Sequence, residues 1–311
     1  MAELPDANKA QQAKIFSAMM AYSLCSSTLL LANKTSILHL PRPAIVNSIQ
    51  IIFSIGFMLC LKLFGIEIDQ LEWSKAKNYF VYVAAFTISR YSNMKALQHS
   101  NVETVIVFRA CAPLAVSVVE YLFMGRSFPS VRTCASLTVV CIGAAVYCYA
   151  DSEFSVHGVK AYSWVFVYFV LLIFEMTYCK RLTSAAKMRS KWGPVFYCNV
   201  LAVIPTLLLA YATGEISNLS GAVADMSIVG YLVILFSCIG GTCIGYVVWI
   251  VIDLVSATTY TLVGVVNKFF TGLLNVLLWD KHSTPTGLAA MFICLGASAF
   301  YEQAPMRTKR T

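Results

Sequence analysis

The chain alternates long apolar blocks with short polar connections along almost its whole length. A helix rises about 1.5 Å per residue, so roughly 20 apolar residues are enough to cross the hydrocarbon core of a bilayer. We place such blocks at residues 15–38, 43–64, 78–98, 101–124, 130–150, 160–180, 192–212, 227–250, 256–279 and 284–302. The pattern therefore predicts an all-α membrane protein with ten transmembrane helices.

The composition agrees with this class of protein. Hydrophobic residues make up 59% of the sequence and charged residues 12%, which is more apolar than soluble domains usually are. The first block follows a polar segment, residues 1–14, and has no small-residue cleavage site, so we expect a retained helix and not a signal peptide. All 11 cysteines fall in apolar blocks without metal-ligand spacing, and we interpret them as small core residues.

Basic residues gather on one side of the predicted membrane. If the N-terminus is cytosolic, the connections on the opposite side hold only Arg42, Lys160 and Lys281, and the basic C-terminal tail is cytosolic. Because cytosolic loops carry an excess of lysine and arginine, we expect both termini in the cytosol. This asymmetry accounts for most of the formal charge of +8, so the charge gives no reason to expect a nucleic-acid partner.

The two halves of the sequence resemble each other. Residues 102–129 align loosely with residues 258–285, and Cys-Ile-Gly-Ala at 141–144 is echoed by Cys-Leu-Gly-Ala at 294–297. Five helices, an odd number, separate the copies, so the second must be inverted across the membrane, as in secondary transporters. A chance match of small residues in apolar helices is the alternative. We expect a cytosolic tail at 1–14, a first five-helix repeat at 15–150, a lumenal linker at 151–159, a second five-helix repeat at 160–302 and a cytosolic basic tail at 303–311.

A polar face on the predicted helix 256–279 is the main candidate binding surface. At about 100° per residue, Tyr260, Gly264, Asn267 and Lys268 fall on one side of the helix. Lys268 lies near the middle of the span, where a charge is costly unless it faces a cavity or a partner. We therefore expect these residues to bind substrate. A lysine that snorkels to a headgroup or is neutralised by a buried acid is the alternative.

Other intramembrane charges divide into two groups. Lys34 follows an asparagine on a polar face that also holds Tyr22, and with Lys268 it suggests an anionic substrate. Arg109 is expected to pair with an acid, Glu103 or Glu120, or else to serve the substrate as well. A further pair, Arg90 and Lys95, is interpreted as snorkelling near a helix end.

The predicted seventh helix contains Phe196-Tyr197-Cys198-Asn199. The amide of Asn199 offers a donor and an acceptor that suit a purine edge, and Phe196 or Tyr197 could stack on the base. Packing between helices is the alternative role for such a group. In the eighth helix Gly240, Gly241 and Gly245 leave room either for substrate or for close helix packing.

These motifs carry a specific resemblance. Phe196-Tyr197-Cys198-Asn199 and Gly264-Val265-Val266-Asn267-Lys268 resemble the helix-seven and helix-nine motifs of nucleotide-sugar transporters of the drug/metabolite transporter superfamily, in the GDP-sugar branch. The resemblance implies that Asn199 contacts guanine and that Gly264, Asn267 and Lys268 contact the sugar and phosphates. It also implies that Tyr22 and Tyr260 line the sugar pocket and that Lys34 belongs to a matching Asn-Lys pair. Cys198 departs from the family's first asparagine and removes one base contact.

The family resemblance implies a Golgi membrane protein that exchanges a GDP-sugar for GMP by alternating access, without a cofactor. GDP-fucose or GDP-mannose is the expected substrate, and GDP-galactose also fits. Membrane lipid surrounds the protein, and a homodimer is compatible with the sequence. A phosphate-sugar or other metabolite exporter of the same superfamily is the alternative function. An embedded enzyme is disfavoured because the lumenal acids and the four histidines are scattered.

Overall fold

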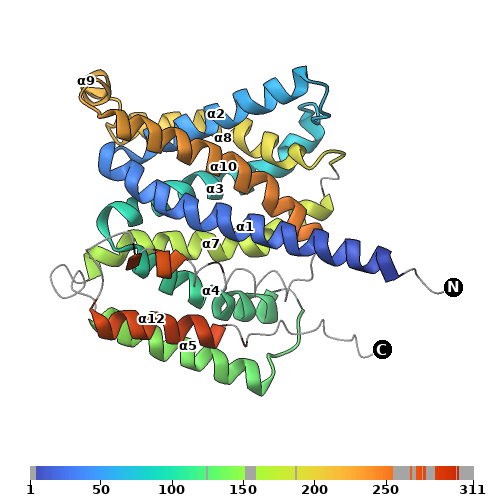
Figure 1. The fold of residues 1–311 in the computed structure, drawn as a ribbon, viewed down its shortest axis with the longest axis vertical. Coiled ribbons are helices and arrows are strands. Elements are labelled where there is room, and N and C mark those ends of the chain that lie inside the picture. The colour runs from blue at the N-terminus through green and yellow to red at the C-terminus, as the bar shows by residue number, and fades with distance from the viewer. Residues whose placement is uncertain are drawn as a thin grey trace.

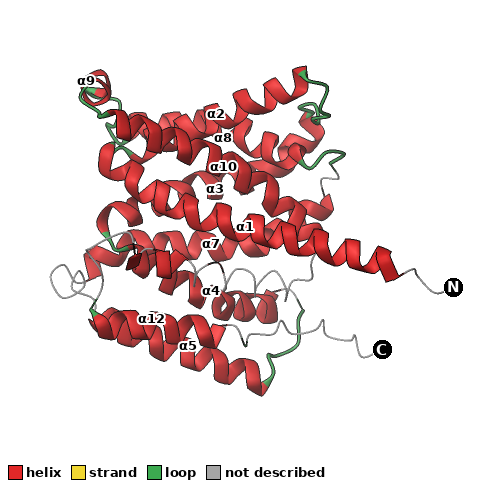
Figure 2. Cartoon of the chain, viewed as in Figure 1, coloured by secondary structure: helices red, strands yellow, loops and turns green. Residues whose placement is uncertain are grey.

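The computed structural model of the chain is a bundle of helices. It describes residues 5–123, 125–150, 159–185, 188–254, 267, 271–274, 276–277, 284–298 and 300. All elements within these ranges are helices, and most run roughly parallel or antiparallel to one another (Figure 1, Figure 2). The all-α prediction is therefore confirmed for the described part of the chain.

The helix bounds follow the predicted blocks closely. The helices are α1 (Pro5–His39), α2 (Pro43–Leu63), α3 (Trp73–His99), α4 (Val102–Phe123), α5 (Val131–Ala150), α7 (Val159–Ala185), α8 (Trp192–Ala212), α9 (Leu219–Ala224), α10 (Ile228–Leu254) and α12 (Pro285–Ser298). The short helix α9 was not predicted, because its six residues are too few for an apolar period. Of the predicted span 256–279, only Asn267, 271–274 and 276–277 lie within the described residues, and these are helical.

Six of the described helices are long and apolar enough to cross a membrane. These segments are Ala13–His39, Pro43–Leu63, Val102–Phe123, Val131–Ala150, Trp192–Ala212 and Ile228–Val251. Shorter apolar stretches occupy Tyr162–Tyr178 and Pro285–Ala297. Helix α3 is long but carries Arg90, Lys95 and many hydroxyl and amide side chains, which lower its apolar character. The chain is thus a multi-pass membrane protein by the length and composition of its helices.

Four helices of the first half of the chain each pack along a helix of the second half. Helix α1 lies along α10, α2 along α8, α3 along α7, and α5 along α12 (Figure 1). Helix α4 contacts α5, α7 and α12. Each early helix therefore finds its main neighbour in the later part of the chain, which ties the two parts into one bundle.

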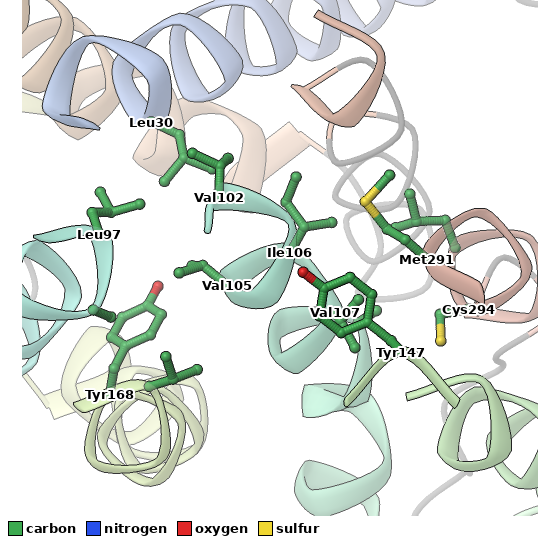
Figure 3. Packing of buried hydrophobic residues seen from close by; sticks show 14 of the residues in the cluster. Leu30, Leu97, Val102, Val105, Ile106, Val107, Tyr147, Tyr168, Met291 and Cys294 are labelled. Atoms are coloured by element: carbon green, nitrogen blue, oxygen red, sulfur yellow. The ribbon is translucent and has the colours of Figure 1, made fainter. Parts of the chain in front are cut away.

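A large apolar core joins α1, α3, α4, α5, α7 and α12. Figure 3 shows Val102, Ile106 and Val107 of α4 at its centre, between Tyr168 on one side and Tyr147 on the other. The hydroxyl of Tyr147 lies 3.0 Å from that of Thr104, so the tyrosine is both packed and hydrogen-bonded. Burying a tyrosine in this way requires a partner for its hydroxyl, which α4 supplies.

The echoed segments of α5 and α12 pack against each other. A Cβ atom built on Gly143 would lie 2.7 Å from the sulfur of Cys294 and 3.3 Å from the carbonyl oxygen of Ala290. The thiol of Cys294 donates to the carbonyl oxygen of Val140 at 3.4 Å, and the hydroxyl of Ser136 donates to the carbonyl oxygen of Ala297 at 2.5 Å. A small residue at 143 is what lets the two helices approach this closely.

We expect Gly143→Val to destabilise the bundle by about 1–3 kcal/mol, because the added methyl groups overpack the contact with α12. The measurement is the thermal unfolding temperature of the purified protein in detergent. Gly296→Val is the matched control, since Gly296 occupies the echoed position and has no atom within 4 Å of its built Cβ. Equal losses in the two variants would contradict the importance of this contact.

The intramembrane charges are placed differently from part of the prediction. Arg90 does not snorkel: one of its guanidinium nitrogens donates to the side-chain oxygen of Gln50 in α2 at 2.8 Å. The carboxylate of Glu120 lies 3.1 Å from Nε of Arg126. Arg90 was misassigned because its helix face points to a polar partner on another helix, which hydropathy along α3 cannot reveal.

Candidate substrate-binding site

Asn267 lies inside the bundle, hydrogen-bonded to α1. Its side-chain oxygen accepts from the hydroxyl of Ser27 at 2.5 Å, and the side chain is 4% exposed. The hydroxyl oxygen of Thr271 lies 2.9 Å from the hydroxyl oxygen of Ser27 and 2.9 Å from the backbone oxygen of Asn267, two acceptors that share its one hydrogen. The amide predicted to bind substrate therefore faces α1 and not lipid.

Asn199 is also buried, at the contact between α8 and α2. Its side-chain nitrogen donates to the backbone oxygen of Val195 at 3.0 Å and to the hydroxyl of Ser54 at 3.3 Å. Ser54 and Gln50 lie four residues apart on α2, so they share one face of that helix. The Asn199 amide thus begins a polar stripe along α2.

The two aromatic residues before Asn199 occupy different environments. Tyr197 is fully buried, and its hydroxyl donates to the backbone oxygen of Gln70 at 2.5 Å and accepts from the backbone nitrogen of Glu72 at 2.8 Å. Its ring lies 5.4 Å from that of Tyr79. Phe196 is half-buried and packs against the clusters around Ile51 and Met58. In this conformation Tyr197 ties the connection between α2 and α3 to α8.

Tyr22 and Lys34 lie on α1, about three turns apart. Tyr22 is 8% exposed and packs with Val251 of α10. The ammonium of Lys34 donates to the backbone oxygens of Leu97 and Ser100 at 2.5 and 3.0 Å. A cation at the C-terminal carbonyls of a helix is favoured by the helix dipole, so Lys34 stabilises the end of α3 in this conformation.

A polar network that the sequence analysis did not identify connects four helices. The side-chain nitrogen of Gln50 in α2 donates to the side-chain oxygen of Asn33 in α1 at 2.9 Å and to the hydroxyl of Ser237 in α10 at 3.0 Å. Its oxygen accepts from Arg90 of α3. Gln50 is 2% exposed. A glutamine inside an apolar block is energetically unfavourable unless it is paired, so the sequence could have marked Gln50 as a network residue. It could not identify the partners, because they lie on three other helices.

The glycines of α10 have distinct neighbours. A Cβ on Gly240 would contact Leu29 of α1 at 3.5 Å, and one on Gly245 would meet Val195 of α8 at 3.2 Å. A Cβ on Gly241 would have no atom within 4 Å. Close helix packing therefore explains Gly245, whereas an added Cβ on Gly240 would make an ordinary van der Waals contact and Gly241 leaves open space beside the helix.

Two carboxylates fasten α2 and α8 at opposite ends of the pair. Asp69, in the connection between α2 and α3, accepts from the backbone nitrogens of Arg189 and Ser190, just before α8, at 3.1 and 2.8 Å. Glu215, just after α8, accepts from the backbone nitrogens of Ala44 and Ile45, in the first turn of α2, at 2.8 and 3.2 Å. Each acid is 8% exposed. Glu215 therefore satisfies unpaired amide groups in the first turn of α2, and Asp69 satisfies two amide groups in the segment that leads into α8.

Three predicted site residues, Tyr260, Gly264 and Lys268, lie outside the described residues. The structure places Asn267 against α1, and Asn199 with Phe196 against α2. The remaining predicted residues lie apart from these: Tyr22 packs with α10, Lys34 bonds the end of α3, and Tyr197 bonds the connection between α2 and α3. In the described part of the chain, no three histidine, cysteine or acidic side chains gather as metal ligands would. The candidate site is therefore organised around amides, hydroxyls and cations.

Buried amides and cations within a bundle of apolar helices define a multi-pass membrane protein with a polar interior, as carriers of polar solutes have. The chain belongs to the UAA transporter family, whose model matches residues 12–304.

Its relatives are transporters of GDP-sugars by name. The chain is 33% identical to GDP-fucose transporter 1 of Arabidopsis thaliana, over 96% of this chain and 88% of that protein. It is 30% identical to GDP-mannose transporter GONST3 of Arabidopsis thaliana, over 96% and 80%. Identity to GDP-mannose transporter 2 of Vanderwaltozyma polyspora is 21%, over 93% and 92%. The predicted membership of the GDP-sugar branch of nucleotide-sugar transporters is thus confirmed, and these relatives are not enzymes.

Proposed function

We propose that this protein transports a GDP-sugar across a membrane, with GDP-fucose or GDP-mannose as the expected substrate. The supporting observation is that Asn199 and Asn267, the amides of the two motifs, are both buried in the bundle, on separate helical segments, in a chain similar over most of its length to GDP-sugar transporters. Buried amides supply the donors and acceptors that a base and a sugar require.

The proposed substrate contacts are shared between the two motifs. Asn199 hydrogen-bonds the guanine, with Phe196 beside the base, and Asn267 with Lys268 holds sugar or phosphate oxygens. Gly264 admits the sugar to the backbone, and Tyr22 with Tyr260 lines its pocket. Tyr197 and Lys34, whose polar atoms bind backbone oxygens of neighbouring segments, hold the helices around the site in position.

We further propose the architecture of ten membrane helices in two inverted five-helix repeats, residues 15–150 and 160–302. Helices α1, α2, α3 and α5 then correspond to α7, α8, α10 and α12. This correspondence exchanges the α1–α10 pair with the α3–α7 pair and maps the α2–α8 and α5–α12 pairs onto themselves. It also exchanges Asp69 with Glu215. The described contacts thus have the two-fold pattern that inverted repeats produce.

The transport cycle proposed here is an exchange of GDP-sugar for GMP by alternating access, in the Golgi membrane with both termini cytosolic. The charge asymmetry of the connections supports this orientation. The free-energy cost of reorienting a central site that contains cations is lower when an anion neutralises them, because an unpaired charge away from water is unfavourable. Exchange of one anionic nucleotide for another follows from this difference.

Uptake into liposomes tests the proposal. Purified protein is reconstituted into vesicles that contain GMP, UMP or no nucleotide. Labelled GDP-fucose, GDP-mannose or UDP-galactose is added outside, and the label that accumulates inside the vesicles is measured. We expect GMP-loaded vesicles to take up a GDP-sugar at least ten times faster than empty or UMP-loaded vesicles. Equal uptake of the GDP-sugars and UDP-galactose would contradict guanine recognition, and equal uptake by empty vesicles would contradict the exchange.

A further inference from the structure

The polar network of Gln50 lies between the candidate site and one end of the bundle. On α1, Asn33 of the network comes six residues after Ser27, the partner of Asn267, which is a rise of about 9 Å. On α2, Gln50 comes four residues before Ser54, the partner of the buried amide of α8, which is about 6 Å. Helices α1 and α2 are antiparallel and joined by a short connection. Both steps therefore lead from the candidate site towards the end of α1 and the start of α2.

Five helices meet at that end. Helix α1 ends at His39, and a Cβ atom built on Gly230, in the first turn of α10, would lie 3.2 Å from Cβ of His39. Lys34 bonds the last carbonyl oxygens of α3, and Glu215, just after α8, bonds the first turn of α2. The ends of α1, α3 and α8 and the starts of α2 and α10 thus lie together, remote from the N-terminus (Figure 1). In the proposed orientation this end is lumenal.

Apolar side chains close this end beyond the network. One residue from each of α1, α2, α3, α8 and α10 packs in a single cluster there, and none is more than 6% exposed: Ile37, Ala44, Met94, Ala210 and Ile234. Nearer the candidate site, Gln50 ties α2 to α1, α3 and α10 by hydrogen bonds. A ligand at the candidate site can leave through this end only if these helices separate.

Between the network and this cluster lie polar atoms that the closed arrangement leaves unpaired. Asn47 comes between Ala44 and Gln50 on α2, and neither polar atom of its side chain has a hydrogen-bond partner among the residues that the structure describes. The same holds for the hydroxyl of Ser36 on α1. Asn47 is 1% and Ser36 0% exposed. A buried polar atom without a partner is unfavourable, so water reaching this layer on opening would recover part of the free energy.

We infer that the Gln50 network and the cluster around Ile37 form the barrier that closes the lumenal side of the transporter, and that Asn47 makes this barrier easy to reopen. The inference rests on the proposed function, since a barrier has to open only if substrate passes. Gln50 stabilises the closed form, because its bonds to Asn33 of α1 and Ser237 of α10 hold those helices against α2. Asn47 destabilises the closed form, because its amide is unpaired there. The two residues thus act in opposite directions on one equilibrium.

The helix contacts indicate which parts separate. Helix α1 packs along α10 and α3 along α7, while α2 and α8 are joined at both ends. An opening that keeps these pairs intact moves α1 and α10 away from α3. It breaks the bonds of Lys34 to the end of α3 and those of Gln50 to α1 and α10. The distance between the ends of α1 and α3 therefore reports the state of the barrier.

The test measures this distance in variants of Gln50 and Asn47. Spin labels are placed at Leu38 of α1 and His99 of α3, both exposed, through a non-canonical amino acid, because the chain has 11 cysteines of its own. Distances are recorded in vesicles with saturating GMP, so that the loaded protein exchanges between its forms. We expect Gln50→Leu to raise the ratio of long to short distances about tenfold, and Asn47→Leu to lower it about tenfold.

Stability and transport provide a second readout. Asn47→Leu should have an unfolding temperature equal to or higher than that of the wild type, because an apolar side chain removes the unpaired amide. Its rate of GMP-driven GDP-sugar uptake should nevertheless fall about tenfold, since the barrier opens less often. Its affinity for GMP, measured by calorimetry, should stay within about twofold, because Asn47 lies away from the candidate site. A residue with a purely structural role would not combine higher stability with slower transport.

Two further variants complete the comparison. Ser48→Ala is the control, since Ser48 adjoins Asn47, is buried and donates within its own helix to the backbone oxygen of Ala44 at 2.8 Å; it should leave the distances unchanged. Ser237→Ala removes one acceptor of Gln50 and repeats the test, with a smaller shift in the same direction, if Gln50→Leu does not fold.

The outcomes separate the barrier from the proposed function. Shifts in the same direction for the Gln50 and Asn47 variants, or no shift in either, overturn the barrier even if the wild type exchanges GDP-sugar for GMP. If the wild type takes up no GDP-sugar, the proposed function fails, whereas opposite shifts of the two variants would still support the barrier as a property of the fold.

Discussion

Asn267→Ala is expected to reduce GDP-sugar uptake about 100-fold. The substitution removes an amide that the proposed function assigns to the sugar or phosphates, and about 3 kcal/mol is the cost of losing its hydrogen bonds in a buried site. It also removes the acceptor of the Ser27 hydroxyl and so loosens the contact with α1. The measurement is the initial rate of uptake into GMP-loaded liposomes, normalised to the amount of reconstituted protein.

Thr271→Val separates the two roles of Asn267. It removes the hydroxyl that donates to Ser27 and to the Asn267 backbone but keeps the Asn267 amide. We expect a stability loss of about 1 kcal/mol with uptake retained within a few-fold. If Thr271→Val lost as much uptake as Asn267→Ala, packing of this segment on α1 and not substrate contact would be the function of Asn267.

Asp69→Ala and Glu215→Ala are each expected to lower the free energy of unfolding by about 2–4 kcal/mol. Each substitution leaves two backbone amide groups without their acceptor and removes a negative charge from a helix N-terminus. Asp69 is also packed against Gly193, whose built Cβ would lie 2.5 Å from its carboxylate. Unfolding temperatures measured at one pH and one detergent concentration check the prediction.

Glu72→Ala is the control for these variants. Glu72 follows Asp69 in the same connection, but its side chain is 52% exposed and pairs with Lys75 at 3.0 Å, three residues away. Exposed pairs of this kind contribute about 0.2–1 kcal/mol, so the expected loss is small. Similar losses for Asp69→Ala and Glu215→Ala would support their equivalence in two inverted repeats. A loss at only one of the two would contradict that equivalence.

Hydropathy predicted most of the helices within a few residues, and the reason is physical. Polar backbone groups in a bilayer must bond within the helix, so apolar length alone determines where helices lie. The bounds of α2 and α8, Pro43–Leu63 and Trp192–Ala212, agree with the predicted 43–64 and 192–212 within one residue. The extension of α1 back to Pro5 was not predicted, since a helix can continue through polar residues outside the membrane.

The candidate site was harder to predict, because a helical face does not identify its partner. The motif around Tyr197 suggested stacking on a base, whereas the tyrosine hydroxyl bonds the backbone of Gln70 and Glu72. Lys34 suggested an anion, whereas its ammonium lies at the last carbonyls of α3. Both contacts join residues more than 60 positions apart in the chain. Spacing along one helix contains no information on such pairs.

The carboxylate contacts at both ends of α2 and α8 limit how this protein can change shape. Because these hydrogen bonds join the two helices at both ends, α2 and α8 can tilt together. Sliding or separation of the two helices would require the hydrogen bonds to break. The remaining helices would therefore move relative to this fixed frame. Spin labels on α2 and α8 should keep one separation throughout the transport cycle, while a label on α1 changes its distance from both.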